Sequence, residues 1–152
     1  MKRVVVAMSG GVDSSVAALL LKKQGYDVIG ITMRLWPEEL CGSHGERSCC
    51  SLESIEDARA VANQLGIPYY VLNVEDDFNQ EVINYFCSEY SKGRTPNPCI
   101  VCNQKIKFGS LLAKAKNLGA DFIATGHYAM VDYDSKSGRY FIKEGKDKAK
   151  TL

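Results

Sequence analysis

The chain has 152 residues, 45% of them hydrophobic, and a formal net charge of +1. This composition is enough for the buried core of one ordinary domain. No apolar run approaches the roughly 20 residues of a membrane span, and a strand begins directly after Lys2 and Arg3 with no signal peptide before it. We therefore expect a cytoplasmic protein with no membrane partner. Six cysteines favour a reducing compartment and thiol chemistry over a disulfide framework.

Hydrophobic periodicity and turn residues predict strands that alternate with helices. The expected strands are 3–8, 27–34, 69–74 and 121–125, and the expected helices are 13–24, 52–65, 76–90 and 99–117. An irregular loop should run to Cys50, and a hairpin should pair 129–133 with 139–143.

This alternation predicts an α/β fold with right-handed crossovers: a three-layer, doubly wound, mostly parallel, Rossmann-like sheet with a C-terminal hairpin. We treat residues 1–152 as one domain. Ligands bind such sheets at the carboxyl ends of the strands. The segment after strand 3–8, Met33 in strand 27–34 and Gly126 after strand 121–125 should therefore share one edge.

Residues 9–15 read Ser-Gly-Gly-Val-Asp-Ser-Ser between a buried strand and a helix. Glycines allow positive φ and close approach of a ligand, and backbone N–H groups at a helix start attract anions. Asp13 is a candidate magnesium ligand. The segment is not a Walker phosphate loop because no Gly-Lys-Ser/Thr follows. The alternative is an ordinary strand–turn–helix corner.

A second group of candidate residues surrounds two cysteines. Asn97 is a good N-cap and Pro98 suits the first helical position, which places Cys99 and Cys102 in the first turns of a helix. The helix dipole, Lys105 and Lys107 should favour thiolates, which attack electrophiles, carry sulfur or bind soft metals. The alternatives are two small core residues or half of a zinc site completed by Cys49 and Cys50. Cys87 is expected in the core.

Charges are segregated along the chain. Acidic residues dominate 51–89, whereas 91–120 contains only basic ones: Lys92, Arg94, Lys105, Lys107, Lys114 and Lys116. Such a basic face suggests a nucleic acid partner. The alternative is a solvated helix face.

Several motifs occur in one order: SGGVDSS at 9–15, ITM at 31–33, CCSLE at 49–53, GRTPNP at 93–98, CN at 102–103, IKFG at 106–109 and ATGHY at 124–128. The first resembles the loop of the PP-loop ATP pyrophosphatases. Together they resemble the catalytic domain of the tRNA-specific 2-thiouridylases, over essentially the whole chain. The resemblance implies an adenine nucleotide alpha hydrolase type of fold.

The resemblance also implies site residues and a reaction. It assigns ATP binding to Ala7, Met8, Ser9, Gly10, Gly11, Val12, Asp13, Ser14, Met33 and Gly126. It assigns contact with tRNA to Asn97, Pro98, Cys99 and Lys150, to which the basic stretch adds Lys105 and Lys107, and nucleophilic catalysis to Cys102, with Cys99 beside it. The C2 oxygen of the wobble uridine would be adenylated with release of pyrophosphate, and sulfur from a protein persulfide would displace AMP.

The sequence departs from the family pattern in three ways. Many members carry Asp where this chain has Cys99, and the CxxC pair also admits an iron–sulfur cluster, which needs further ligands. Only the lysine of a Lys-Asp-Gln segment is matched, at Lys150. The family's second catalytic cysteine and its later tRNA-binding and β-rich regions are absent from these 152 residues. Two other functions remain open: another PP-loop adenylating ligase, or a non-catalytic adenine-nucleotide-binding module.

Overall fold

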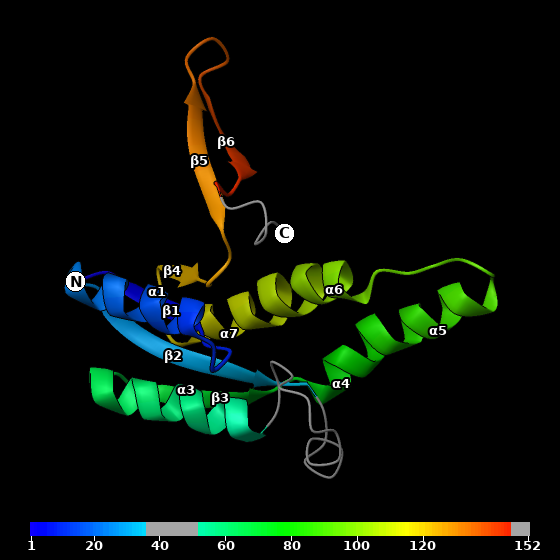
Figure 1. The fold of residues 1–152 in the computed structure, drawn as a ribbon, viewed down its shortest axis with the longest axis horizontal. Coiled ribbons are helices and arrows are strands. Elements are labelled where there is room, and N and C mark those ends of the chain that lie inside the picture. Colours follow the sequence, from blue (N-terminus) through cyan, green and yellow to red (C-terminus); the bar gives the residue numbers. More distant parts are fainter. Residues whose placement is uncertain (36–51, 147–152) are drawn as a thin grey trace.

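The computed structural model describes residues 1–35 and 52–146. Its centre is a four-stranded parallel sheet in the order β3-β2-β1-β4 (Figure 1). The strands are β1 (Arg3–Ala7), β2 (Asp27–Arg34), β3 (Tyr69–Asn73) and β4 (Phe122–Ala124). The order reverses between β1 and β4, so the switch point lies at the carboxyl end of β1, as expected for a ligand site in a doubly wound sheet.

Strand β1 is one of the two inner strands of the sheet, and it pairs on both sides. Val5 lies opposite Ile29 of β2 and Ile123 of β4. Both faces of β1 are covered, and Val4, Val5 and Val6 are all buried. A continuous apolar run is typical of such a strand.

Helices cover both faces of the sheet. On one face, α1 (Val12–Lys23) and α3 (Leu52–Leu65) bring Ala18, Ala58 and Ala62 against Val4 and Val6. On the other face, α7 (Leu111–Asn117) brings Leu111 and Ala115 against β1 and β2. These three layers confirm the predicted doubly wound fold. The alanines allow the helices to approach the sheet closely.

Residues 75–117 form a helical arm, which extends beyond the sheet (Figure 1). Its first half joins α4 (Glu75–Phe78), η1 (Asn79–Ile83) and α5 (Asn84–Ser91), and its second joins α6 (Pro98–Val101), η2 (Cys102–Ser110) and α7. Phe78, Val82 and Ile106 pack between the halves. The segments η1 and η2 are π-helical, with wider turns than α-helix. Both halves were predicted as helices, but the π-helical turns were not.

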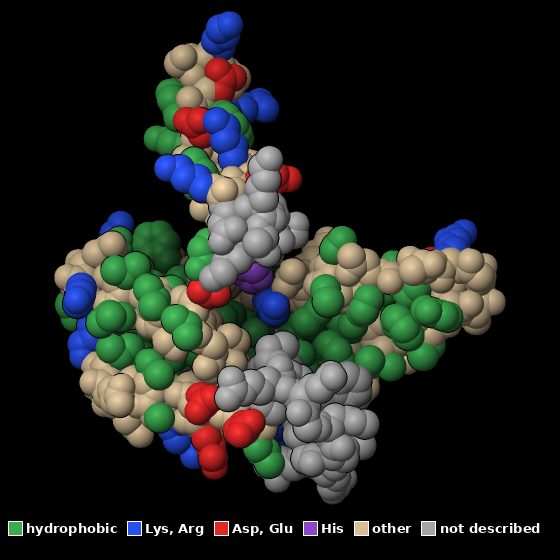
Figure 2. Space-filling view, viewed as in Figure 1, with side chains coloured by type: hydrophobic (Ala, Val, Ile, Leu, Met, Phe, Trp, Pro, Cys, Tyr) green, Lys and Arg blue, Asp and Glu red, His purple; other side chains and the backbone are tan. Residues whose placement is uncertain are grey.

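The acidic and basic stretches of the sequence lie side by side in this arm. Glu81 pairs with Lys105 at 3.8 Å, and Ser110 Oγ donates to Asp77 at 2.6 Å. At the end of α5, Glu89 pairs with Lys92 and Arg94 at 3.5 and 3.4 Å. Much of the basic charge that looked isolated in the sequence is therefore partly compensated in the fold. Hydrophobic side chains also spread over the visible surface of the arm (Figure 2).

Strands β5 (Ala129–Asp134) and β6 (Arg139–Glu144) form the predicted hairpin, which stands away from the sheet (Figure 1). Val131 lies opposite Ile142 and Tyr133 opposite Tyr140, and all four side chains are exposed. One side of the hairpin is therefore an open apolar face.

The placement of Cys87 corrects one prediction. We expected this residue in the core, but its side chain is exposed. Val82 and Ile83 of η1 make the core contacts of this half of the arm, while Cys87 lies farther along α5, which buries no residue completely. Within residues 1–35 and 52–146, no helix has the length and apolar character needed to cross a membrane.

Candidate functional site

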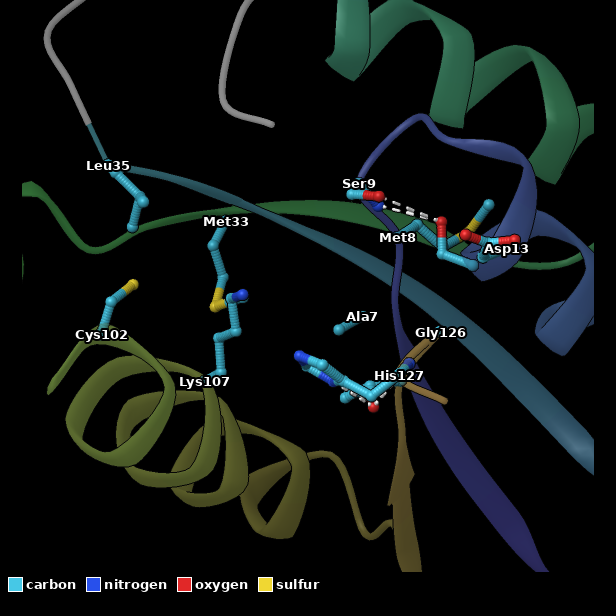
Figure 3. A pocket seen from close by; sticks show the side chains of 12 residues that line it. Ala7, Met8, Ser9, Asp13, Met33, Leu35, Cys102, Lys107, Gly126 and His127 are labelled. Atoms are coloured by element: carbon cyan, nitrogen blue, oxygen red, sulfur yellow. Dashed lines mark hydrogen bonds between the residues drawn. The ribbon is translucent and has the colours of Figure 1, made fainter. Parts of the chain in front are cut away.

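A cavity of about 210 Å³ opens at the carboxyl end of β1, between the sheet and the helical arm (Figure 3). Its described lining comes from the ends of three strands, the start of α1 and η2. The lining residues are Ala7, Met8, Ser9, Asp13, Ser14, Met33, Leu35, Cys102, Lys107, Thr125, Gly126 and His127. The topology thus brings the serine-glycine segment and the cysteine helix, far apart in sequence, to one site.

The serine loop (residues 9–14) is held by its own hydroxyl groups. Ser14 is 3% exposed, and its Oγ accepts from the Ser9 N–H at 3.2 Å and donates to the Gly11 carbonyl at 3.1 Å. The first turn of α1 follows directly, and the N–H groups of a first helical turn have no partners within their own helix. The start of α1, with Asp13 and Ser14 at the cavity, therefore places the positive end of the helix dipole beside it.

Two glycines allow close backbone contacts around this loop. Gly10 has φ +78°, and a Cβ there would lie 2.4 Å from the carbonyl oxygen of Ser54 in α3. A Cβ on Gly126 would lie 2.7 Å from the backbone nitrogen of Ser14. The end of β4 therefore presses against the start of α1, and only glycine fits at that contact.

A buried hydrogen-bond network supports the loop from below. Thr32 Oγ1 donates to the Met8 carbonyl at 2.7 Å, and Tyr69 Oη donates to Thr32 Oγ1 at 2.7 Å. Burial raises the pKa of Tyr69, so the phenol stays a neutral donor. This network fixes the last residue before the serine loop relative to β2 and β3.

The Asp13 carboxylate lies at the cavity, and Tyr128 Oη donates to its Oδ1 at 2.7 Å. Among the described residues, no group of three or more His, Cys, Asp and Glu side chains is placed to hold a metal. An all-protein metal cage is therefore not formed in this part of the chain. A magnesium ion that is bound mainly by phosphates needs only one or two carboxylates, and Asp13 suits that role.

Cys102 and Lys107 line the cavity from η2 and face the serine loop (Figure 3). Asn97 caps the helix as predicted, since its Oδ1 accepts from the Ile100 N–H at 3.3 Å and Pro98 follows it. Cys102 is half-buried against the core of the arm, whereas Cys99 is exposed and outside the cavity lining. The structure thus separates the two cysteines, one facing the cavity and one facing solvent.

His127 sits at the end of β4, with its Nδ1 2.7 Å from Thr125 Oγ1. Burial, and secondarily the charge of Lys107, lowers the pKa of His127 below its usual 6.5. The imidazole is therefore mostly neutral at pH 7. It can exchange hydrogen bonds with a ligand but adds little positive charge.

Most of the predicted nucleotide residues meet at the cavity. Gly10, Gly11 and Val12 do not line it: Gly10 packs on Ser54, and the Val12 side chain is 77% exposed. The predicted tRNA contacts Asn97 and Cys99 and the basic Lys105 are exposed and Pro98 is half-buried, all outside the cavity. Lys150, Cys49 and Cys50 lie outside the described residues.

Three lining residues lie outside the set that was assigned to ATP, tRNA or catalysis: Leu35, Thr125 and His127. Thr125 and His127 flank Gly126, which was assigned to ATP, so their position at the end of the expected strand 121–125 could have identified them as well. Leu35 directly follows β2, at the same edge of the sheet as Met33.

The chain is similar to known proteins over nearly its whole length, including the segments that line the cavity. A sequence model of the family described as "tRNA methyl transferase HUP domain" matches residues 2–151. The chain belongs to this family. A curated relative from Moorella thermoacetica, named tRNA-specific 2-thiouridylase MnmA, is 61% identical over 96% of this chain and 41% of its own length. The protein of the same name from Caldicellulosiruptor saccharolyticus is 59% identical over 98% of this chain and 42% of its own length. The chain thus spans about two fifths of these relatives.

Solved structures add support for the fold. The glutamine-dependent NAD+ synthetase from Acinetobacter baumannii, solved with ADP, superposes with a TM-score of 0.55 at 18% identity, over 83% of this chain and 22% of that one. NMN synthetase from Francisella tularensis gives 0.51 at 20% identity, over 80% of this chain and 43% of that one. At these identities the likeness concerns the fold alone.

Proposed function

We propose that this chain is the ATP-binding, cysteine-bearing catalytic domain of a tRNA 2-thiouridylase. The observation that carries the proposal is a single cavity that joins the serine loop to Cys102. A site that both activates an oxygen with ATP and transfers sulfur needs a phosphate-binding loop and a thiol on opposite sides of one substrate. The 61% identity to a curated 2-thiouridylase supports this assignment.

The chemistry suits the residues at the cavity. The C2 oxygen of the wobble uridine attacks the α-phosphorus of ATP, and the bond to pyrophosphate breaks. Adenylation turns a poor leaving group into AMP. The terminal sulfur of a Cys102 persulfide then attacks C2, and AMP departs with the original oxygen. A second thiol must take up the Cys102 sulfur to release 2-thiouridine, and in this family that thiol is supplied by the later part of the protein.

The cofactors fit this site to different degrees. The rigid loop and the glycine contacts suit the phosphates of ATP, and Asp13 suits one coordination position of a phosphate-bound magnesium ion. An iron–sulfur cluster fits less well within the described residues, because Cys99 faces solvent while Cys102 faces the cavity. Four cysteine ligands on one cluster would need Cys99 to turn and further ligands to join it.

The partners we propose are tRNA and a persulfide donor protein. Asn97, Pro98 and Cys99 form the exposed start of the helix that carries Cys102, so a uridine reaching Cys102 would pass beside them. A phosphate backbone would then follow the exposed basic residues of the arm, among them Lys105. We further propose that residues 1–152 act as one domain in the cytoplasm.

The decisive experiment grafts residues 1–146 of this chain onto the remainder of the Moorella relative, in place of the matched region. With ATP, magnesium, unmodified tRNA and a persulfide donor, the chimera should form 2-thiouridine, measured by mass spectrometry of tRNA nucleosides. The Cys102→Ser chimera should release pyrophosphate but form no 2-thiouridine. A folded chimera that binds ATP and tRNA without making product would contradict the proposal.

The same assay separates the two alternatives. An adenylating ligase for nitrogen transfer would release pyrophosphate with a different acceptor and would not need Cys102. A binding module would bind ATP without releasing pyrophosphate. The 152-residue chain alone should bind ATP but not thiolate tRNA, because it supplies one of the two cysteines that the family reaction needs.

A further inference from the structure

Lys107 occupies a position in the cavity that neither periodicity nor the family resemblance assigned to it. Its side chain is half-buried and lines the same cavity as Ser9 and Asp13 (Figure 3). The sequence had grouped Lys107 with Lys105 as an RNA contact. The two lysines in fact face different surroundings.

The π-helical turns of η2 explain this placement. In an α-helix, residues five apart point roughly 140° away from each other. In η2 the backbone bonds run from residue i+5 to residue i, as in the bond from the Leu111 N–H to the Ile106 carbonyl. Residues five apart then lie about one turn above each other. Cys102 and Lys107 therefore share one face of the helix, and both reach the cavity.

The charge around Lys107 points to an anionic ligand. Lys105 pairs with Glu81 at 3.8 Å, but no carboxylate among the described residues lies within ion-pair distance of Lys107. Lys107 is also the one lysine or arginine in the described lining of the cavity. The lowered pKa keeps His127 largely neutral. A partly desolvated ammonium group gains most from a counter-charge that a ligand brings.

We propose that Lys107 binds a phosphate group of the nucleotide, from the wall opposite the serine loop, and so holds the α-phosphate region beside Cys102. This inference rests on the proposed binding of ATP. Lys107 would compensate negative charge that the neutral hydroxyl and N–H donors of the loop leave uncancelled. Because Cys102 lies one π-turn away, the same lysine fixes the distance between the phosphate and the thiol.

The test compares ligands with and without phosphates. Calorimetry should show that Lys107→Met weakens ATP binding by about ten- to hundredfold, the range for a charge-assisted hydrogen bond, and leaves adenosine binding unchanged. Lys107→Arg should restore most of the affinity. Lys23→Met, at an exposed lysine in the last turn of α1 and outside the cavity lining, is the matched control and should bind ATP as the unaltered chain does.

A second measurement needs no variant. Acylation of lysines by an amine-reactive reagent, followed by peptide mass spectrometry, should show ATP protecting Lys107 several-fold while Lys105 stays equally reactive. Equal labelling of Lys107 with and without ATP would overturn the proposal even if Lys107→Met failed to fold.

The outcomes distinguish this inference from the proposed function. If the unaltered chain does not bind ATP, both fail. If it binds ATP and Lys107→Met binds equally well, only the role of Lys107 fails. If Lys107→Met keeps its ATP affinity but loses tRNA affinity and salt dependence, the phosphate that Lys107 binds belongs to the RNA, and the proposal is wrong.

Discussion

Tyr128 donates a 2.7 Å hydrogen bond to Asp13, a residue 115 positions earlier in the chain. The bond ties the segment after β4 to the first turn of α1, where Gly126 also contacts Ser14. Asp13, the carboxylate most suited to a metal ion, is therefore held by a residue that follows β4, the strand on the other side of the switch point from β2. The bond therefore joins the candidate metal ligand Asp13 directly to the segment that leads into the hairpin.

We expect Asp13→Ala to weaken magnesium-dependent ATP binding by at least tenfold and to change binding without magnesium much less. The reason is that Asp13 is the carboxylate in the described lining of the cavity. Calorimetry with and without magnesium measures the difference. Asp57→Ala, on the exposed side of α3, is the control, and equal magnesium dependence in both variants would remove Asp13 from the metal site.

Gly126→Ala should destabilise the protein, because its new Cβ would lie 2.7 Å from the Ser14 nitrogen. Overpacking of this kind costs about 1–3 kcal/mol. Gly109→Ala should instead be neutral or stabilise by up to about 1 kcal/mol, because Gly109 is helical and its Cβ would meet only an ordinary contact at 3.7 Å. In urea unfolding, the midpoint of Gly126→Ala should fall while that of Gly109→Ala stays the same or rises, and an equal fall in both variants would contradict the geometry.

His127 should titrate below pH 6.5, since burial and then Lys107 lower its pKa. The unfolded chain binds this proton more tightly, so the stability associated with the neutral imidazole is complete above about pH 6.5 and is lost as pH falls through that value towards the folded pKa. NMR titration can follow the ring, with His44→Gln used to assign the other histidine. Lys107→Met should raise the midpoint, and an unchanged midpoint would show that Lys107 does not act on His127.

Lys105→Gln should weaken tRNA binding and lower the slope of log K against log salt by about 0.7–0.9, the value for one phosphate contact. Lys105 is exposed on the arm, and its pairing with Glu81 at 3.8 Å is loose. Lys23→Gln, in the last turn of α1, is the matched control. The slope is measured from tRNA binding at several salt concentrations. If both variants keep the original slope, Lys105 is a solvated surface residue and makes no phosphate contact.

ATP should slow the alkylation of Cys102 at neutral pH and leave Cys87 and Cys99 unaffected. Cys102 lines the cavity, whereas the other two thiols are exposed elsewhere. In the absence of ATP, we expect Cys102 to react faster than Cys87, because it lies in the first turns of a helix that carries lysines. Iodoacetamide labelling with peptide mass spectrometry reports each cysteine separately. Equal protection of all three would mean a global change of structure and not occupation of this cavity.

The sequence was a good guide where local and global signals agree. The strand from Asp27 to Arg34 and the helix from Leu52 to Leu65 have the predicted bounds, because apolar periodicity and end signals coincide there. The ends of parallel strands also predicted that Met33 and Gly126 would meet the serine loop. Such inferences need only topology.

Other features depended on packing that a one-dimensional pattern does not contain. The π-helical turns of η2 change which residues share a face, so Lys107 joined Cys102 at the cavity. Pairing of Glu81 with Lys105 depends on how two halves of the arm lie together. Exposure of Cys87 reflects the extension of α5 beyond the sheet.

The hairpin has a consequence for the order in which the backbone opens. Both of its strands are edges, and Val131 and Ile142 are 69% and 77% exposed, so few buried contacts oppose local opening. Amide protons of β5 and β6 should exchange with solvent earlier than those of the four-stranded sheet, and proteases should cut the hairpin before they cut that sheet. Strands β1 and β2 are each paired on both sides, so among the described strands their amides should exchange last. One of these two slowly opening strands, β1, therefore leads directly into the serine loop.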